Sequence, residues 1–195
     1  RYHRGLLWNN VSNLNLYNGN ARISANQNIW WRRQPSQRYR GARVRCLDEP
    51  ARFDDDGNIL TTWDEENEAN REGWVWVSPY WDPDTQIKVC AIDAQEDLFS
   101  SEGTRCDTNQ GMNSADCGCG PQLEWCASNQ TAQMMTRSLS ESLDRFISWA
   151  ITQGDTYIDL FESPRFFING PLAHFFRHHT RVGRYSFNPS PIPEE

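Results

Sequence analysis

The sequence predicts an α+β fold in which a small antiparallel β region and a disulfide-tied loop pack on two to three helices. Three observations favour this fold. Short aromatic and β-branched runs between turn residues fill 47–105, six cysteines offer cross-links, and an amphipathic helical pattern begins at 132. We expect an irregular Arg/Asn-rich arm at 1–46, a disulfide-stabilised domain at 47–186 and a Pro-rich tail at 187–195.

The composition predicts one small core. Only 37% of the 195 residues are hydrophobic, but the chain has nine Trp, nine Phe and six Tyr. Soluble domains are usually about 45–50% apolar, and each buried aromatic side chain removes roughly 150–250 Å² from water. No run of 18 apolar residues occurs, so a membrane-spanning helix is not expected. The start at Arg1 without a leader suggests a mature or proteolysed piece of a longer polypeptide.

Charge is sorted along the chain. Residues 1–47 contain nine Arg and no acidic residue, whereas the whole chain has a net charge of −7. The basic arm either lies on an acidic segment of this chain or of a partner, or binds an external polyanion. We favour the first interpretation because residues 48–102 contain sixteen acidic side chains. The net acidity argues against nucleic acid as a partner.

The local pattern places the elements in order. In the arm, neither helical nor strand periodicity persists, and we expect one short helix and a strand over 39–46. An Asp-Gly turn at Asp56-Gly57 predicts a hairpin, and strands are expected at Trp74–Val77 and Ile87–Ile92. The loop 79–84 joins these two strands.

The C-terminal part reads as helical. Apolar residues recur at helical spacing over 132–154, and Gly154 supplies the stop. We expect a short helical turn at 156–161 and a last helix at 171–179, with Asn169 as its N-cap. The predicted buried face of the long helix consists of Met135, Leu139, Leu143, Phe146, Ile147, Ala150 and Ile151.

The cysteines predict the compartment. There is no CxxC pair and no CxxCH, which excludes the usual zinc-ribbon, thioredoxin-type and c-type haem motifs. An even number at irregular spacing predicts disulfides and an extracytoplasmic location, periplasmic, outer-surface or secreted; the alternative is a cytosolic chain with inert buried thiols. Cys117 and Cys119 are not expected to pair with each other, but the pairing is otherwise open among Cys46, Cys90, Cys106, Cys117, Cys119 and Cys126.

The loop between Cys106 and Cys117 is a candidate calcium site. Its oxygen-bearing side chains surround a glycine, as calcium coordination requires, although the match to an EF-hand loop is poor. The alternative is a polar loop that is simply exposed. The candidate ligands are Asp107, Asn109, Asn113 and Asp116.

His174 and His178 stand four residues apart, so they share one face of the last helix. This spacing suits a metal, but a third ligand is missing, and exposed polar-face histidines are the alternative. No firm cofactor follows from the sequence. Haem is expected only if a partner chain supplies it, with one of these histidines as axial ligand.

The arm carries a cluster of aromatic and arginine side chains. Such clusters stack on sugars or single-stranded nucleic acid, but more ordinarily they pack within a fold or at a protein interface. We expect an interface with other subunits. Its candidate residues are Trp30, Trp31, Arg32, Arg33, Arg38, Tyr39 and Arg40.

Three stretches carry a resemblance: Trp81 to Glu96, Cys117 to Cys126, and Asp159 to Phe175 with its F-x-N-x-x-L-A core. They resemble parts of large exported myxobacterial and planctomycete proteins, in which uncharacterised domains accompany planctomycete-type cytochrome c modules. The resemblance implies export, disulfides and a multidomain parent. It supplies no active site, because the haem attachment motif is absent.

The expected function is therefore non-enzymatic. We predict an exported structural or assembly module that contacts partner subunits through its aromatic and arginine arm. One alternative is an accessory subunit of an extracytoplasmic electron-transfer complex with a cytochrome. The other, a secreted hydrolase or carbohydrate-binding protein, draws on the many tryptophans and acidic residues.

Overall fold

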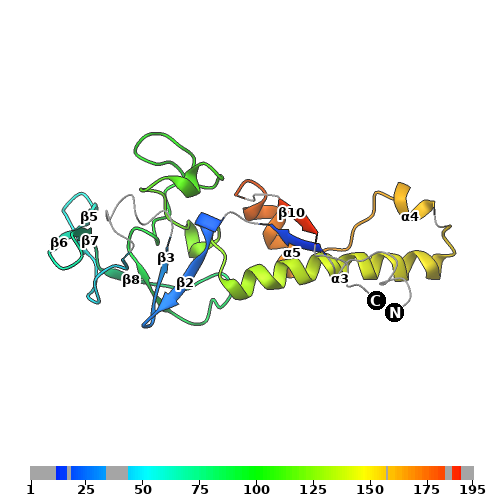
Figure 1. The fold of residues 1–195 in the computed structure, drawn as a ribbon, viewed down its shortest axis with the longest axis horizontal. Coiled ribbons are helices and arrows are strands. Elements are labelled where there is room, and N and C mark those ends of the chain that lie inside the picture. The colour runs from blue at the N-terminus through cyan, green and yellow to red at the C-terminus, as the bar shows by residue number, and fades with distance from the viewer. Residues whose placement is uncertain (1–11, 17–18, 34–43, 157, 183–185, 190–195) are drawn as a thin grey trace.

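The computed structural model describes residues 12–16, 19–33, 44–156, 158–182 and 186–189, and it confirms the α+β fold (Figure 1). One sheet has four strands, and three sheets have two strands each. The strands are β1 (Ser12–Asn15), β2 (Ile23–Asn26), β3 (Ile29–Arg32), β4 (Arg52–Phe53), β5 (Ile59–Leu60), β6 (Thr62–Asp64), β7 (Ala69–Arg71), β8 (Trp74–Val77), β9 (Ile87–Cys90) and β10 (Ser186–Pro189). The helical elements are η1 (Gly19–Ala21), η2 (Gly111–Asn113), η3 (Pro121–Leu123), α3 (Asn129–Gln153), α4 (Asp159–Glu162), α5 (Gly170–His174) and η4 (Phe175–His179).

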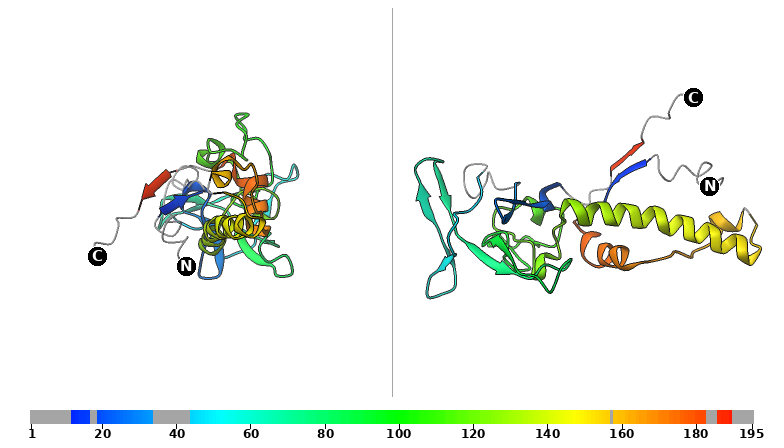
Figure 2. Two further views of the ribbon diagram at one scale, coloured as in Figure 1. Left: turned by 90° about the vertical axis from the view of Figure 1, so that its right-hand side faces the viewer. Right: turned by 90° about the horizontal axis from the view of Figure 1, so that it is seen from below.

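The molecule is elongated. The four-stranded sheet and the cysteine-rich loop form the middle, and the hairpins β4–β5 and β6–β7 lie at one end (Figure 2). Helix α3 runs away from the sheet to the opposite end, where α4 lies beside its last turns. Helix α5 packs against α3 on the way back toward the sheet.

The central sheet has the order β2-β3-β9-β8, and it is mixed because β3 and β9 run parallel. Strands β2 and β3 belong to the segment expected to be an irregular arm, so that expectation is corrected for residues 23–32. They form a hairpin because Gln27 and Asn28 both adopt positive φ, of 52° and 67°, as a two-residue hairpin turn requires. The strand expected over 39–46 lies largely outside the described residues.

The predicted Asp-Gly hairpin is confirmed as β4–β5. The Asp54 carboxylate accepts hydrogen bonds from the backbone N–H groups of Asp56 and Asn58, at 3.0 and 2.7 Å, and Gly57 has a φ of 84°. The Asn58 side-chain amide, which donates to Asp54 Oδ2 at 2.9 Å, and these backbone bonds stabilise the charged form and lower the pKa of the exposed Asp54 carboxyl. One local turn therefore explains this acidic run.

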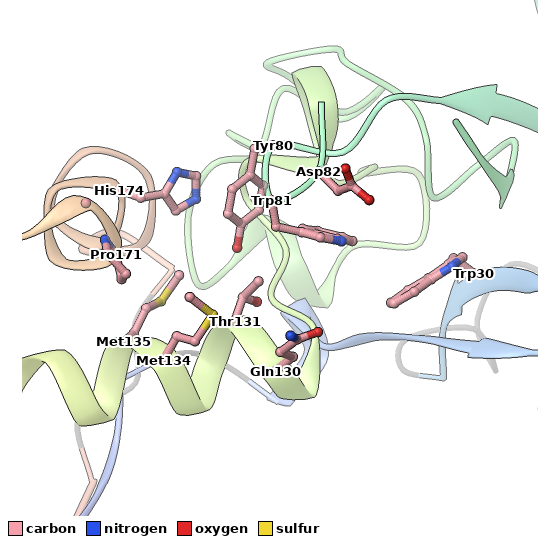
Figure 3. Close-up of a pocket in the computed structure, with 11 residues that line it drawn as sticks. Trp30, Tyr80, Trp81, Asp82, Gln130, Thr131, Met134, Met135, Pro171 and His174 are labelled. Carbon is pink, nitrogen blue, oxygen red and sulfur yellow. The ribbon is translucent and has the colours of Figure 1, made fainter. Parts of the chain in front are cut away.

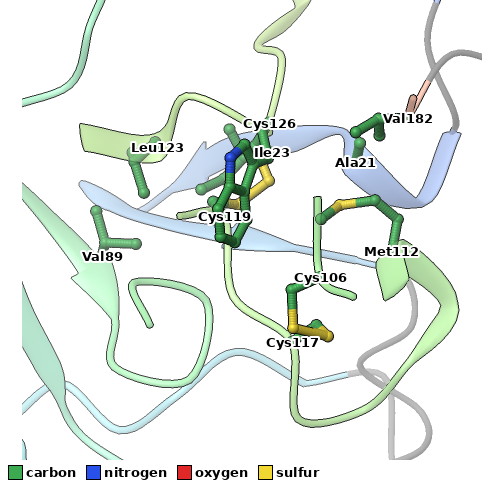
Figure 4. Close-up of a cluster of buried hydrophobic side chains, with 11 residues drawn as sticks. Ala21, Ile23, Val89, Cys106, Met112, Cys117, Cys119, Leu123, Cys126 and Val182 are labelled. Atoms are coloured by element: carbon green, nitrogen blue, oxygen red, sulfur yellow. A yellow bond between two sulfur atoms is a disulfide. The ribbon is translucent and has the colours of Figure 1, made fainter. Parts of the chain in front are cut away.

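Three disulfides cross-link the described chain: Cys46–Cys90, Cys106–Cys117 and Cys119–Cys126. The prediction that Cys117 and Cys119 bond elsewhere is confirmed. The last two bridges are part of the largest buried cluster, with Ile23 and Val89 of the sheet (Figure 4). Each bridge contributes roughly 2–4 kcal/mol by restricting the unfolded chain. This offsets the low apolar content noted in the sequence.

Arg32 is the polar centre of this region, and its side chain is fully buried. Its Nε donates to Asp93 Oδ1 at 3.0 Å, its backbone N–H donates to Asp93 Oδ2 at 3.1 Å, and its Nη2 donates to the Cys117 carbonyl. The Asp93 carbonyl in turn accepts from the Cys119 N–H at 2.8 Å. The ion pair therefore joins β3, the turn after β9 and the cysteine-rich loop.

The long helix is confirmed as α3, but its buried face differs from the predicted one. Leu143 and Ile151 stay exposed, whereas Ser138 and Ser142 are buried. The segment before α5 crosses the helix there: Ser138 Oγ accepts from Asn169 Nδ2 at 2.9 Å, and Ser142 Oγ donates to the Phe167 carbonyl at 2.6 Å. Small polar side chains are needed where backbone approaches this closely.

The predicted helix ends are confirmed. Gly154 ends α3 with a φ of 77°, a left-handed conformation that only glycine adopts freely. Asn169 caps α5 by accepting from the Leu172 N–H at 3.2 Å, and Pro171 lies in the first turn. The last helix continues to 179 as the π-helical turn η4.

Loss of the Arg32 side chain should destabilise the fold strongly. Arg32→Met leaves the Asp93 carboxylate buried without its cation, so we expect the free energy of unfolding to fall by about 3–5 kcal/mol. Urea denaturation followed by circular dichroism measures this change. Arg137→Met, at an exposed position of α3, should shift it by less than about 0.5 kcal/mol. Equal effects of the two substitutions would contradict the central role of Arg32.

Candidate functional site

A pocket of about 580 Å³ lies where the sheet, α3 and α5 meet (Figure 3). Volumes of this size are typical of small-molecule sites. Four separate segments line it: β3, the loop between β8 and β9, the first two turns of α3, and α5. The lining residues are Trp30, Tyr80, Trp81, Asp82, Gln130, Thr131, Met134, Met135, Gly170, Pro171 and His174.

One wall of the pocket is a row of four aromatic rings in contact. The ring centroids of Trp30 and Trp81 are 5.5 Å apart, those of Trp81 and Tyr80 5.0 Å, and those of Tyr80 and His174 3.7 Å. Tyr80 and His174 stack, while Tyr80 meets Trp81 at 85°. We call these four residues the aromatic row. Each ring is half-buried, so each keeps part of its surface accessible.

The opposite wall is the start of α3. Ser128 caps this helix by accepting from the Thr131 N–H at 3.1 Å, which fixes where Gln130 and Thr131 point. Met135 is buried, whereas Gln130 and Met134 are exposed at the mouth of the pocket. The facing loop is held by a 2.9 Å backbone hydrogen bond from the Tyr80 N–H to the Gln122 carbonyl. Both walls are therefore positioned by backbone contacts.

Two buried polar atoms of the aromatic row lack a hydrogen-bond partner among the described residues: the Tyr80 hydroxyl and His174 Nε2. The Tyr80 hydroxyl approaches Thr131 without reaching full hydrogen-bond geometry, and burial raises the pKa of Tyr80 to about 12. Burial, reinforced by His178, lowers the pKa of His174 to about 4. Both side chains are therefore neutral near pH 7.

The other histidines of the last helix lie beside the pocket. His178 Nδ1 lies 3.3 Å from Glu124 Oε2, and the His178 ring stacks on His174 at 4.7 Å. His179 is fully buried, which lowers its pKa to about 3. In the part of the chain that the structure describes, these histidines do not form a group of three metal-ligating side chains. A metal or haem at His174 and His178 stays a prediction.

The oxygen atoms of the candidate calcium loop contact protein donors. Asp107 accepts from Arg105 Nη2 at 2.7 Å and from Arg181 Nη1 at 3.2 Å. Asp116 accepts from the side chains of Ser101 and Ser114, and these bonds outweigh its burial and lower its pKa to about 2. The side chain of Asn113 is hydrogen-bonded to Asn20 and to the Asn109 carbonyl. Calcium binding there stays a prediction and would require these contacts to rearrange.

Over the described ranges, the single cluster of three metal-ligating side chains is Cys46, Glu72 and Cys90. Its two sulfur atoms are bonded to each other in a disulfide, so they are not thiolate ligands. None of the helices in the described part has both the length and the apolar composition to cross a membrane.

The expected interface cluster of the arm is divided by the fold. Trp30 lines the pocket, and Arg33 is exposed. Trp31 and Arg32 are instead buried within the chain, Trp31 against the Cys46–Cys90 bridge. The expected place of Trp31 and Arg32 on a partner-binding surface is therefore corrected. Trp31 packs inside the chain, and Arg32 forms the buried ion pair. Arg38, Tyr39 and Arg40 lie outside the described residues.

Other large apolar side chains stay exposed on two parts of the molecule. The hairpin group lies on strands β4 to β8, and comprises Phe53, Leu60, Trp63 and Trp76. The helical group lies on the end of α3 and on the segments that follow, and comprises Ile151, Ile158, Phe166, Ile168 and Phe176. Trp63 is 56% exposed and Ile158 is 64% exposed. Contiguous exposed apolar surface commonly marks an interaction site.

Comparison with known proteins gives no match: no family model, no curated protein and no solved structure is significantly similar to this chain. The resemblance to exported proteins with cytochrome modules therefore stays a prediction. Of the pocket residues, the sequence pattern indicates Trp30 and His174 as candidate site residues and none of the others. Their convergence depends on tertiary contacts between segments at least 35 residues apart along the chain, the shortest separation being that of Met135 and Gly170.

The buried histidines should make stability depend on pH. The unfolded chain takes up protons at His174 and His179 near their ordinary pKa of 6.5, whereas the folded chain takes them up only near pH 4 and 3. Their contribution is therefore complete above pH 6.5 and is lost as pH falls toward 4. Urea unfolding between pH 7 and 4.5 should show uptake of about two protons from these residues.

The variants His174→Phe and His179→Phe keep an aromatic ring at each position and remove the titrating nitrogens. Each should decrease the proton uptake on unfolding by about one near pH 5. A urea midpoint in the parent chain that does not change over this pH range would contradict the burial of both rings.

Proposed function

We propose that this chain is a non-enzymatic assembly module of an extracytoplasmic protein, and that it binds partner subunits through the hairpin group and the helical group. The observation that supports the proposal most directly is the exposure of nine large apolar side chains in two separate regions. Exposed aromatic side chains are enriched where a second chain binds. This assigns the partner-binding role to different residues from those expected in the arm.

The hairpin group sits on a part of the fold with little core of its own. Strands β4 and β5 have two residues each and show no buried side chain. On strand β8, Trp74 and Trp76 meet edge to face at 5.3 Å, and Lys88 Nζ lies 4.1 Å from the Trp74 ring centroid. Aromatic side chains presented by short hairpins are typical of a surface that is covered by a second chain.

The helical group has similar features. Phe166 and Phe176 pack edge to face at 5.9 Å, and Arg165 covers the Trp149 ring at 4.5 Å. Leu143 and Ile151, expected to face the core, instead remain on the outer side of α3. Aromatic residues and arginine are the side chains most enriched at protein interfaces. A partner packed here would bury the apolar positions that the chain itself leaves open.

An extracytoplasmic location is supported by the three disulfides, which persist in oxidising compartments.

A binding role is supported by the chemistry of the pocket. Its lining contains one carboxylate, Asp82, and no serine or cysteine nucleophile beside a base. Hydrolysis of a glycosidic bond normally requires two carboxylates. The predicted electron-transfer role would need a haem from a partner at His174, and no further contact favours it.

Oxidative labelling tests the proposal and does not require the partner to be identified. Hydroxyl radicals label exposed Trp and Phe side chains, and mass spectrometry locates the products. Trp63, Trp76 and Phe166 should be labelled several-fold less in material isolated from the native source than in the purified single chain, because a partner covers them. Phe99, which is exposed outside both groups and outside the pocket, is the reference site. Equal labelling of the three residues in both preparations would refute the proposal.

Substitutions separate binding from folding. Phe53→Ser and Trp63→Ser act at exposed positions, so the free energy of unfolding should change by less than about 0.5 kcal/mol. Both should nevertheless abolish recovery of the native complex on size-exclusion chromatography. Gln86→Ser, at an exposed polar position, should leave the complex intact. Recovery of the complex with both apolar substitutions present would contradict a role for the hairpin group.

A further inference from the structure

We propose that the pocket beside the aromatic row binds a neutral oligosaccharide, with the sugar rings stacked on Trp30 and Trp81. None of the pocket residues belongs to the hairpin group or the helical group. The inference is therefore independent of the assembly role and adds a ligand to it.

The shape of the aromatic row favours an extended ligand. Each ring contacts the next one along the row, and the four rings do not enclose a common space. They therefore form a strip and not a cage (Figure 3). A compact cation needs several ring faces directed at one position. A pyranose ring instead offers a flat apolar face to a single aromatic ring and keeps its hydroxyl groups at the edge. A strip of several rings therefore suits consecutive sugar units.

The charge of the lining favours a neutral ligand over an anionic one. Among the described lining residues there is no Lys or Arg, Asp82 is the single carboxylate, and His174 is uncharged near pH 7 because burial lowers its pKa to about 4. A phosphate, sulfate or carboxylate would enter without a cation to receive it. Neutral hydroxyl groups, by contrast, can donate to the Asp82 carboxylate and bond to the Gln130 amide.

The hydrogen-bonding groups are arranged as a saccharide requires. Asp82 and Gln130 are exposed on opposite sides of Trp81, as Figure 3 shows, so they flank the ring on which a sugar would stack. Deeper in the pocket, the Tyr80 hydroxyl and His174 Nε2 are buried and have no partner among the described residues, so a sugar hydroxyl would reach them only after these side chains move. Met134 and Met135 supply an adaptable apolar wall opposite.

Isothermal titration calorimetry of the full chain with three neutral probes tests this inference: cellohexaose, maltohexaose and fully N-acetylated chitohexaose. At least one should bind with a dissociation constant of about 10 µM to 1 mM. Trp81→Ala and Trp30→Ala should each weaken binding about tenfold or more, since each removes a stacked ring. Gln130→Ala, at an exposed position that contributes little to folding, should weaken it a few-fold.

Trp63→Ala is the matched control, because it removes an exposed tryptophan outside the pocket. It should leave the dissociation constant within about twofold, and urea midpoints of all variants verify that each is folded. Failure of all three probes at millimolar concentration would overturn the inference. So would equal effects of Trp63→Ala and Trp81→Ala. Binding of tetramethylammonium that Asp82→Asn abolishes would show a cation site instead, and binding of heparin hexasaccharide would show an anion site.

Discussion

The ion pair between Arg32 and Asp93 is the interaction on which the arrangement of the other segments depends. Both side chains are fully buried, and a buried charge is tolerated only if its partners are fixed. Arg32 therefore cannot be satisfied unless β3 lies beside the turn after β9 and the Cys117 carbonyl points inward. The neighbouring bridge Cys106–Cys117 holds that carbonyl in place by covalent geometry. The Arg32–Asp93 ion pair thus specifies how these segments are placed, and the Cys106–Cys117 bridge stabilises that placement.

The pocket follows from the same junction. Strand β3 carries Trp30 next to Trp31 and Arg32, and alternation along the strand directs Trp30 away from the cluster around Trp31. The cysteine-rich loop then supports the loop that carries Tyr80 and Trp81. Its Gly120, with a φ of 74°, leaves room for the Trp125 ring, which a Cβ at this position would meet at 2.3 Å. Just beyond, the Gln122 carbonyl holds the Tyr80 N–H. Two members of the aromatic row, Trp30 and Tyr80, are thus positioned by segments that Arg32 and the disulfides bring together.

Local signals predicted the elements whose causes are local. The hairpin after Phe53 requires one Asp-Gly turn, and the ends of α3 and α5 require a glycine or an asparagine at one position. The β2–β3 hairpin was missed because its turn uses Gln27 and Asn28, which lack the glycine that usually marks positive φ. The parallel pairing of β3 with β9 joins residues almost sixty positions apart, and periodicity contains no information on it. Ser138 and Ser142 likewise looked like surface residues, because only the crossing of the 167–169 segment explains their burial.

The aromatic and arginine cluster shows why composition could suggest a binding surface but not locate it. Tryptophan and arginine side chains pack on each other inside a fold as well as across an interface. Here Arg32 is held by the buried ion pair and Trp31 packs against the Cys46–Cys90 bridge, whereas Trp30 and Arg33 keep accessible surface among the described members of the cluster. The surface available to the proposed partners is the apolar surface that the chain leaves exposed. Since the pocket shares no residue with the hairpin group or the helical group, a ligand and a partner subunit can occupy the molecule together.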